Sequence, residues 1–343
     1  MSPLPPGAME LLAEAGVSGE ISAARLSGGM NNQVFRVTGG GRTVVLKSYF
    51  HDAHDSRDRL GAEWGFLTAA QDLGVGCVAA PLARATAHHL GVYSFLAGRL
   101  PVPEDVSAAA VDQALAFVTR LNPASRAVEH GRLPAASEAC FSGAQHLGTV
   151  DRRLDRLSRA LGDSPVEQEA ARFLRDDLGP LWTRIRDDIA TGLARLGIDP
   201  AAEIPAAERI LSPSDFGFHN ALKTEDGCFA FLDFEYAGWD DPAKLVGDAF
   251  NQVKVPLPQY LYPVFRDTVA ARSPDPAVAR RRFDLLRPLY AVKWVLIILN
   301  DFIPLDERRR AFAGTVDRRA PQLTAARAKF AALAGEYPSL TDS

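Results

Sequence analysis

Hydrophobic and polar residues alternate in several short stretches of the first hundred residues and then change to a helical spacing. Strand-like segments lie at 25–37 and 43–48, with glycines interspersed, and another follows at 92–96. Farther along, apolar residues recur every three or four positions, which is the period of an amphipathic helix. The pattern predicts an α+β chain with a small antiparallel sheet followed by a mainly helical part. Because the strand-like pattern gives way to the helical pattern near Gly98, the sequence predicts domains 1–98 and 99–343.

The helical spacing also predicts individual helices. One begins near Ser107, a residue type that caps helix N-termini. The region 166–196 keeps helical spacing but contains Gly179-Pro180, which predicts a break there. We expect a buried helix over 287–302 and a surface helix over 311–330.

Composition narrows the class of protein. The 343 residues are 47% hydrophobic and carry a formal charge of −4, which gives no general attraction for nucleic acid or anionic membranes. The three cysteines lack metal-ligand spacing and are expected to be reduced. No apolar run approaches the roughly 20 residues of a spanning helix. We expect a cytoplasmic protein without nucleic-acid or membrane partners; the sequence leaves the oligomeric state open.

Polar residues that could take part in catalysis or metal binding gather between 212 and 235. Asp215 precedes Asn220 by five positions, and Asp233 follows a strand-like run at 228–232. The intervening residues predict a β-hairpin, which would bring Asn220 and Asp233 side by side. In phosphoryl transfer, an aspartate accepts the proton of the attacking hydroxyl, while amide and carboxylate oxygens hold Mg²⁺. Asp215 is therefore the candidate base, and Asn220 and Asp233 are the candidate metal ligands.

Each of these residues alone is more typical of a turn, a cap or a strand end. An upstream nucleotide site changes that balance. Ser27, Gly28 and Gly29 form a predicted turn between strands, where glycines let backbone N–H groups approach phosphate oxygens. Lys47 lies at the end of an apolar strand, and Glu63 follows in a helical stretch. From there Glu63 could pair with Lys47, which would position the α- and β-phosphates.

The order of these parts resembles the aminoglycoside phosphotransferase and choline kinase-like family, small-molecule relatives of the protein kinases. The resemblance covers roughly residues 20 to 300 and includes a hinge at 92–98. It implies a two-lobed protein-kinase-like fold that binds ATP and Mg²⁺, with GTP also compatible. It places the adenine against the backbone near Phe95 and Leu96, and a small-molecule hydroxyl acceptor against the helical lobe.

The chain departs from this family before the candidate base. Pro213-Ser214 stands where the family usually has His-Gly, which implies a change in the support of the loop. His219 either restores a contact, orients the acceptor or is an ordinary loop residue. The resemblance also implies that Asp248 bonds the catalytic loop. Asp240 and Asp241 either attract a cationic acceptor or form a turn before Pro242.

The sequence thus favours an ATP-dependent phosphotransferase that acts on a hydroxyl of a sugar, amino sugar or aminoglycoside. An amino-alcohol kinase, for a choline- or homoserine-like acceptor, is the first alternative. A nucleotide-binding pseudokinase is the second, because of the missing histidine. A protein kinase is disfavoured, since no Ala-Pro-Glu-like anchor follows Asp233.

Overall fold

The computed structural model describes residues 3–26, 32–55, 57–123, 133–304, 312 and 318–337. Its contacts group the chain into two compact units. The first unit comprises Met1–Ser137, Leu211–Trp239 and Arg309–Thr315, and the second comprises Glu138–Ile210, Asp240–Arg308 and Val316–Ser343. This grouping by contacts is a different partition from the predicted domains 1–98 and 99–343, which stay a prediction.

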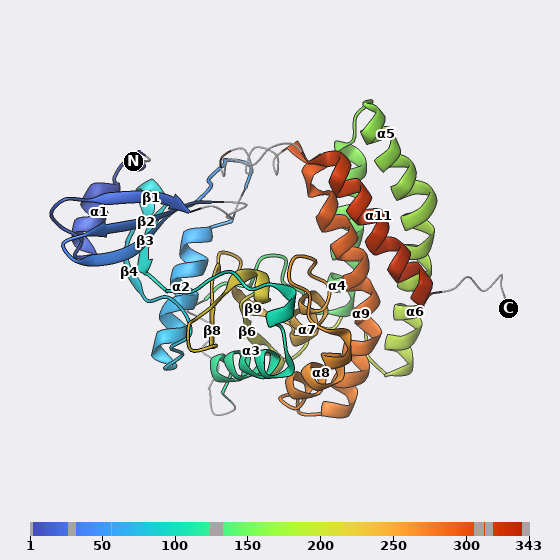
Figure 1. Cartoon of the computed structure of the whole chain (residues 1–343). Helices are drawn as coiled ribbons and strands as arrows, with labels where there is room; N and C mark the ends of the chain where they lie inside the picture. Colours follow the sequence, from blue (N-terminus) through green and yellow to red (C-terminus); the bar gives the residue numbers. More distant parts are fainter. Residues whose placement is uncertain are drawn as a thin grey trace. The chain divides into compact units, whose positions relative to one another are not determined.

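A five-stranded antiparallel sheet forms one part of the first unit and confirms the predicted sheet (Figure 1). In spatial order its strands are β1 (Ser22–Leu26), β2 (Gln33–Gly39), β3 (Arg42–Ser48), β5 (Leu90–Ser94) and β4 (Pro81–Ala85). Strand β4 was not predicted. It begins at a proline, which lacks a backbone N–H, and it lies at the edge of the sheet, where that lack is tolerated.

The sheet buries one face against α1 (Ala8–Glu14). Leu11 and Leu12 of this helix share a core with Phe35, Val44 and Leu46 from β2 and β3. Because successive side chains of a strand point to opposite faces, Lys47 leaves β3 on the face opposite Leu46. Helix α2 (Arg59–Asp72) packs against β4 and β5 and is capped by Asp58, whose side chain accepts a hydrogen bond from the Gly61 N–H. The alternation of β3 therefore separates the sheet's apolar core from its one buried lysine.

The rest of the first unit supports a pair of short hairpin strands. Strands β7 (Ala221–Lys223) and β8 (Phe229–Phe231) pair antiparallel, as predicted, and β6 (Ile210–Ser212) pairs with β9 (Gly238–Asp240). Helix α3 (Ala108–Leu121) packs against β8, and Ser107 caps it as predicted. Phe117 of α3 stacks on Phe231, with ring centroids 4.7 Å apart, and on Phe216 at 5.6 Å. This aromatic cluster is the core beneath the loop that carries Asp215.

The second unit consists mainly of helices. Its helices are α4 (Gly143–Ala160), α5 (Pro165–Arg172), α6 (Gly179–Arg195), α7 (Pro242–Ala249), α8 (Tyr262–Ala270), α9 (Pro276–Ile298) and α11 (Arg319–Glu336). Helix α9 contacts α4, α6, α7, α8 and α11, so it forms the centre of this unit (Figure 1). Short 3₁₀ turns in the two units cover Thr86–His88, Pro103–Asp105, Ala206–Glu208, Phe218–Asn220, Gln259–Leu261 and Leu299–Phe302.

Two helix boundaries differ from expectation, and a third expected boundary lies outside the described residues. The predicted break at Gly179-Pro180 is wrong, because a π-helical segment, Phe173–Leu178, carries the chain directly into α6. The wider turn of a π-helix accommodates a proline, which supplies no hydrogen-bond donor. Helix α9 begins at Pro276, far ahead of residue 287, with Asp275 as its cap. Helix α11 begins at Arg319; residue 311, where we expected a start, lies outside the described residues.

None of the described helices combines the length and hydrophobicity that crossing a bilayer requires.

The aromatic cluster makes a stability prediction. Phe117 is 1% exposed, so Phe117→Ala should leave a cavity and lower the free energy of unfolding by about 3–5 kcal/mol. Urea denaturation followed by tryptophan fluorescence measures this change. Leu100→Ala is the control, because Leu100 is 62% exposed and should change the free energy by less than about 0.5 kcal/mol. Equal midpoints for the two variants would contradict the assigned core.

Candidate active site

Lys47 forms a buried ion pair with Glu63, as the sequence predicted. Its Nζ lies 2.8 Å and 2.9 Å from the two carboxylate oxygens of Glu63. The Tyr49 hydroxyl donates to the same carboxylate at 2.6 Å and lies 2.7 Å from the Tyr93 hydroxyl. Tyr49, itself bonded to Tyr93, therefore gives the Glu63 carboxylate a second buried donor. Burial raises the pKa of Tyr49, and Glu63 raises it further.

Asp233 completes a group of three charged side chains. It follows β8 by two residues, and its Oδ1 lies 2.9 Å from Lys47 Nζ. Burial alone would favour the neutral amine of Lys47, but the negative charges of Asp233 and Glu63 raise its pKa well above the usual range. The Asp233 side chain is 34% exposed, compared with 4% for Glu63. The structure thus leaves Asp233 as the member of the group that solvent or a ligand can reach.

The hairpin brings Asn220 next to Asp233. Ala221 pairs with Phe231 across the hairpin, and the N–H of Leu232 donates to the Asn220 carbonyl at 2.8 Å. Asn220 Nδ2 donates to the Asp215 carbonyl oxygen at 2.9 Å and lies 3.2 Å from Asp215 Oδ2. The predicted base, the predicted metal ligands and the lysine pair therefore belong to one connected set of contacts within the first unit.

The loop before Asp215 is supported by residues that the sequence did not single out. The side chain of Asn122 accepts from the Leu211 N–H at 2.7 Å and donates to the Leu211 carbonyl at 3.1 Å. Ser212 Oγ accepts from the N–H of Ser214, which has a left-handed φ of 64°. At Pro213-Ser214, where the family resemblance has His-Gly, these polar side chains hold the backbone instead. Asn122 gave no sequence signal beyond its place at a helix end.

A second buried network joins the same elements. Asn32 Nδ2 donates to Glu235 Oε2 at 2.7 Å, and Asn32 Oδ1 accepts from the Phe50 N–H at 3.2 Å. Arg59 Nε lies 3.4 Å from Glu235, and Arg59 also donates to Asp55. Burial and the nearby charge of Asp233 raise the pKa of Glu235. Glu235 therefore links Asn32, just before β2, and Arg59 of α2 to the segment that carries Asp233. Sequence reasoning did not predict these contacts.

Of the remaining predicted nucleotide-binding residues, the structure describes Phe95 and Leu96. Phe95 and Leu96 follow β5 directly and are half-buried, and the Arg36 guanidinium stands 4.9 Å from the centre of the Phe95 ring. Ser27, Gly28 and Gly29 fall outside the described residues. Within the described residues, no cluster of three or more His, Cys, Asp or Glu side chains suited to a metal is present.

In the second unit, buried acids are already paired. Asp240 lies 2.5 Å from Lys244, and Asp241 binds both Arg282 and His146. Both aspartates are 0% exposed, so they are not available to attract a cationic acceptor. The carboxylate of Asp248 accepts hydrogen bonds from Lys293 at 2.7 Å and from Trp294 at 2.9 Å. Its expected bond to the loop that carries Asp215 stays a prediction.

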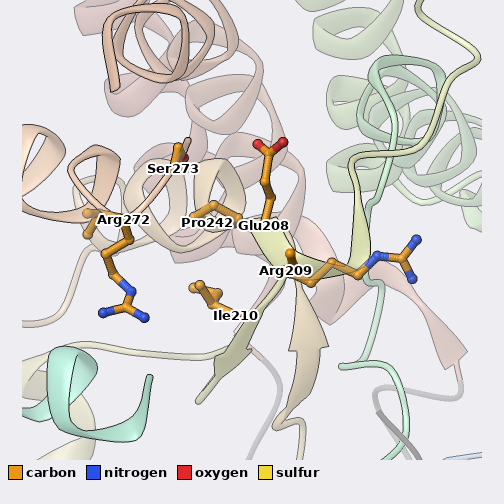
Figure 2. A pocket seen from close by; sticks show the side chains of 8 residues that line it. Glu208, Arg209, Ile210, Pro242, Arg272 and Ser273 are labelled. Atoms are coloured by element: carbon orange, nitrogen blue, oxygen red, sulfur yellow. The ribbon is translucent and has the colours of Figure 1, made fainter. Parts of the chain in front are cut away.

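The second unit contains a pocket that differs from the predicted phosphoryl-transfer site in its lining. Figure 2 shows it between Arg272, Ser273, Pro242 and Ile210, with the Glu208 carboxylate and the Arg272 guanidinium pointing in opposite directions. None of the residues predicted from the sequence to act in phosphoryl transfer lines it.

The sequence model of the phosphotransferase enzyme family matches residues 22–280, a range that includes the whole connected set of contacts. The chain belongs to this family. This phosphotransferase is therefore an enzyme of the small-molecule kinase type. No curated protein matches it significantly.

Solved structures show which fold the phosphotransferase has. A choline/ethanolamine kinase family protein from Mesorhizobium loti aligns with a TM-score of 0.61 at 20% identity, over 95% of this chain and 92% of that one. APH(2″)-IIa, solved with gentamicin, gives 0.60 at 15% identity over 96% and 97%. Spectinomycin phosphotransferase APH(9)-Ia, solved with ADP and spectinomycin, gives 0.59 at 10% identity over 95% and 99%. The phosphotransferase thus has the protein-kinase-like fold of these enzymes, as predicted.

The buried pair of His146 and Asp241 predicts a pH dependence of stability. Burial alone favours the neutral ring, but hydrogen bonding and charge from Asp241 raise the pKa of His146 from 6.5 to about 9. Because the raised pKa belongs to the folded state, the stabilisation is complete below about pH 6.5 and is lost as the pH rises through 9. This pKa difference corresponds to a change in the free energy of unfolding on the order of 3 kcal/mol.

Thermal melting between pH 6 and pH 10 tests this linkage. The wild-type phosphotransferase should lose stability through the upper part of this range more steeply than His146→Gln, which has no proton to lose. Parallel curves for the two proteins would show that folding does not raise the pKa of His146.

Proposed function

We propose that this phosphotransferase transfers the γ-phosphoryl group of ATP to a hydroxyl of a small molecule. One observation carries the proposal: the Lys47 ammonium contacts both Glu63 and Asp233, which lie 16 and 186 residues away in the sequence. A cation fixed between a helix carboxylate and a second, reachable carboxylate is the arrangement that holds a magnesium–triphosphate complex in kinases.

The nucleotide would be bound by residues of the first unit. Lys47, held by Glu63, would neutralise the α- and β-phosphates, and backbone groups near Phe95 and Leu96 would bind the adenine. Ser27, Gly28 and Gly29 remain the predicted phosphate turn. The ADP bound in the structure of spectinomycin phosphotransferase supports an adenine nucleotide, and GTP remains a compatible donor.

Asn220 and Asp233 fit a magnesium site. Asn220 Nδ2 is engaged with Asp215, which leaves the amide oxygen for a metal, and Asp233 supplies a carboxylate that is partly exposed. Two protein oxygens suffice, because Mg²⁺ usually keeps several waters and binds substrate phosphates as well. When bound, Mg²⁺ would neutralise charge on the β- and γ-phosphates.

Asp215 would act as the base. Its side chain is 39% exposed, so an acceptor hydroxyl can approach it. The carboxylate would take the proton of that hydroxyl while the hydroxyl oxygen forms a bond to the γ-phosphorus, and the bond from phosphorus to the β–γ bridging oxygen would break to release ADP.

The acceptor is best described as a sugar, amino sugar or aminoglycoside. A choline site needs aromatic faces around a cation, but Trp182 and Trp239 are only 3% and 4% exposed. Burial of these rings disfavours their use as a cage and so supports a hydroxyl-rich acceptor. An amino-alcohol kinase remains the alternative, supported by the likeness to a choline/ethanolamine kinase family protein. The pseudokinase alternative predicts nucleotide binding without transfer.

An acceptor panel tests the reaction and the base together. ADP release would be followed with Mg·ATP and Mg·GTP against simple sugars, gentamicin, spectinomycin, choline, ethanolamine and homoserine. We expect a sugar or aminoglycoside to stimulate turnover, and Asp215→Asn to lower kcat by about 10²- to 10⁴-fold with nearly unchanged nucleotide affinity. Full activity of Asp215→Asn would contradict the base assignment, and stimulation by choline alone would favour the amino-alcohol kinase.

Loss of Asp233 should act on nucleotide binding instead. Asp233→Ala removes a metal ligand, so the Kd of Mg·ATP measured by calorimetry should rise by about tenfold or more. Asp226→Ala is a matched control, because Asp226 is an exposed carboxylate in the turn of the same hairpin. An unchanged Kd in Asp233→Ala would argue against a metal role for this residue.

A further inference from the structure

His219 contacts the candidate base directly. Its Nε2 lies 3.1 Å from Asp215 Oδ1, while Asn220 Nδ2 lies 3.2 Å from Asp215 Oδ2. Each oxygen of the carboxylate thus meets a nitrogen from one of two consecutive residues.

The two partners differ in burial. The His219 side chain is 7% exposed, whereas that of Asp215 is 39% exposed. The imidazole therefore supports the carboxylate from the protein side, and the carboxylate faces the side that an acceptor reaches. This arrangement favours a supporting role for His219 over direct contact with the acceptor.

The position of the imidazole proton follows from the surroundings. An ionised carboxylate only accepts hydrogen bonds, so Nε2 must carry the hydrogen that faces Asp215. Nδ1 is buried and has no hydrogen-bond partner among the described residues. A hydrogen on Nδ1 would be an unsatisfied buried donor, which costs about 1–3 kcal/mol. The geometry therefore places a hydrogen on Nε2, which donates it to Asp215 Oδ1.

Local structure explains why residue 219 reaches residue 215. Phe218 is 1% exposed, and its ring packs edge-on against Phe229 at 4.8 Å. This anchor fixes the 3₁₀ turn Phe218–Asn220, which the Asn220 N–H closes onto the Gly217 carbonyl at 3.1 Å. With Phe218 buried in the core, the next side chain turns back toward Asp215.

We infer that His219 is a positioning residue for phosphoryl transfer, which fixes the Asp215 carboxylate through its Nε2–H donor. This inference rests on the proposed function, because it takes Asp215 to be the base. A base that is held in one orientation lies ready for the acceptor hydroxyl, whereas a rotating carboxylate is seldom in the productive geometry. The buried His219 thus supports Asp215, which in this chain follows Pro213-Ser214.

Variants of residue 219 test the inference. In His219→Ala the donor is lost, and we expect kcat to fall by about 10- to 100-fold with the Kd of Mg·ATP and the acceptor KM changed less than about twofold. His219→Gln places a neutral N–H donor near the former Nε2 position and should recover most of the loss. His54→Ala is the control, because His54 makes a similar 3.0 Å contact with Asp52 but is 79% exposed.

The assay uses the most active acceptor of the panel, or water as the acceptor if none stimulates ADP release. Full activity of His219→Ala beside an inactive Asp215→Asn would overturn the inference and leave the proposed function intact. Full activity of Asp215→Asn would overturn both. If His219→Ala raises the acceptor KM, or lowers the melting temperature and is not rescued by glutamine, His219 contacts the acceptor or only stabilises the loop, and the positioning role is wrong.

Discussion

The buried ammonium of Lys47 is the constraint on which the first unit depends. Removing a charge from water costs several kcal/mol unless opposite charges and hydrogen bonds surround it. Lys47 meets this demand with Glu63 from α2 and Asp233 from the segment after β8. The sheet, the helix and the hairpin must therefore come together around one cation. Tyr49 and Tyr93 extend the same requirement into a buried hydrogen-bonded chain.

Among the described residues, two of the four non-glycine residues with a left-handed φ lie beside the candidate chemistry. Ser214 and Asp233 have φ values of 64° and 65°, a left-handed conformation that costs a residue other than glycine about 1–3 kcal/mol. Ser214 directly precedes Asp215, and Asp233 follows the second strand of the hairpin. The hydrogen bonds of Asn122 to Leu211 and of Leu232 to Asn220 hold these segments in place. The strain is thus maintained by contacts on both sides of the loop, as expected where side-chain orientation matters for function.

Charged side chains serve different purposes in the two units. In the second unit Asp240, Asp241 and His146 are fully buried and paired, so their charges organise helices rather than meet a ligand. In the first unit Asp215 and Asp233 remain about one third exposed while their partners are buried. A carboxylate that is held from the inside and open on the outside is suited to bind a metal or accept a proton. Exposure, more than charge itself, separates the two groups.

The sequence by itself predicted most of the antiparallel sheet, the hairpin, and the pairing of Lys47 with Glu63, because these depend on local alternation, turn residues and short spacings. The roles of Asp215, Asn220 and Asp233 stay predictions. Only the tertiary structure decided how the site is held. Asn122 lies 89 residues from Leu211, and Asn32 lies 203 residues from Glu235; each is an ordinary residue type until folding places its partner. The contact of His219 is short in sequence, but its direction depends on Phe218 being anchored in the core. Hydrogen bonds of this kind depend on distances and angles that only the packed chain defines.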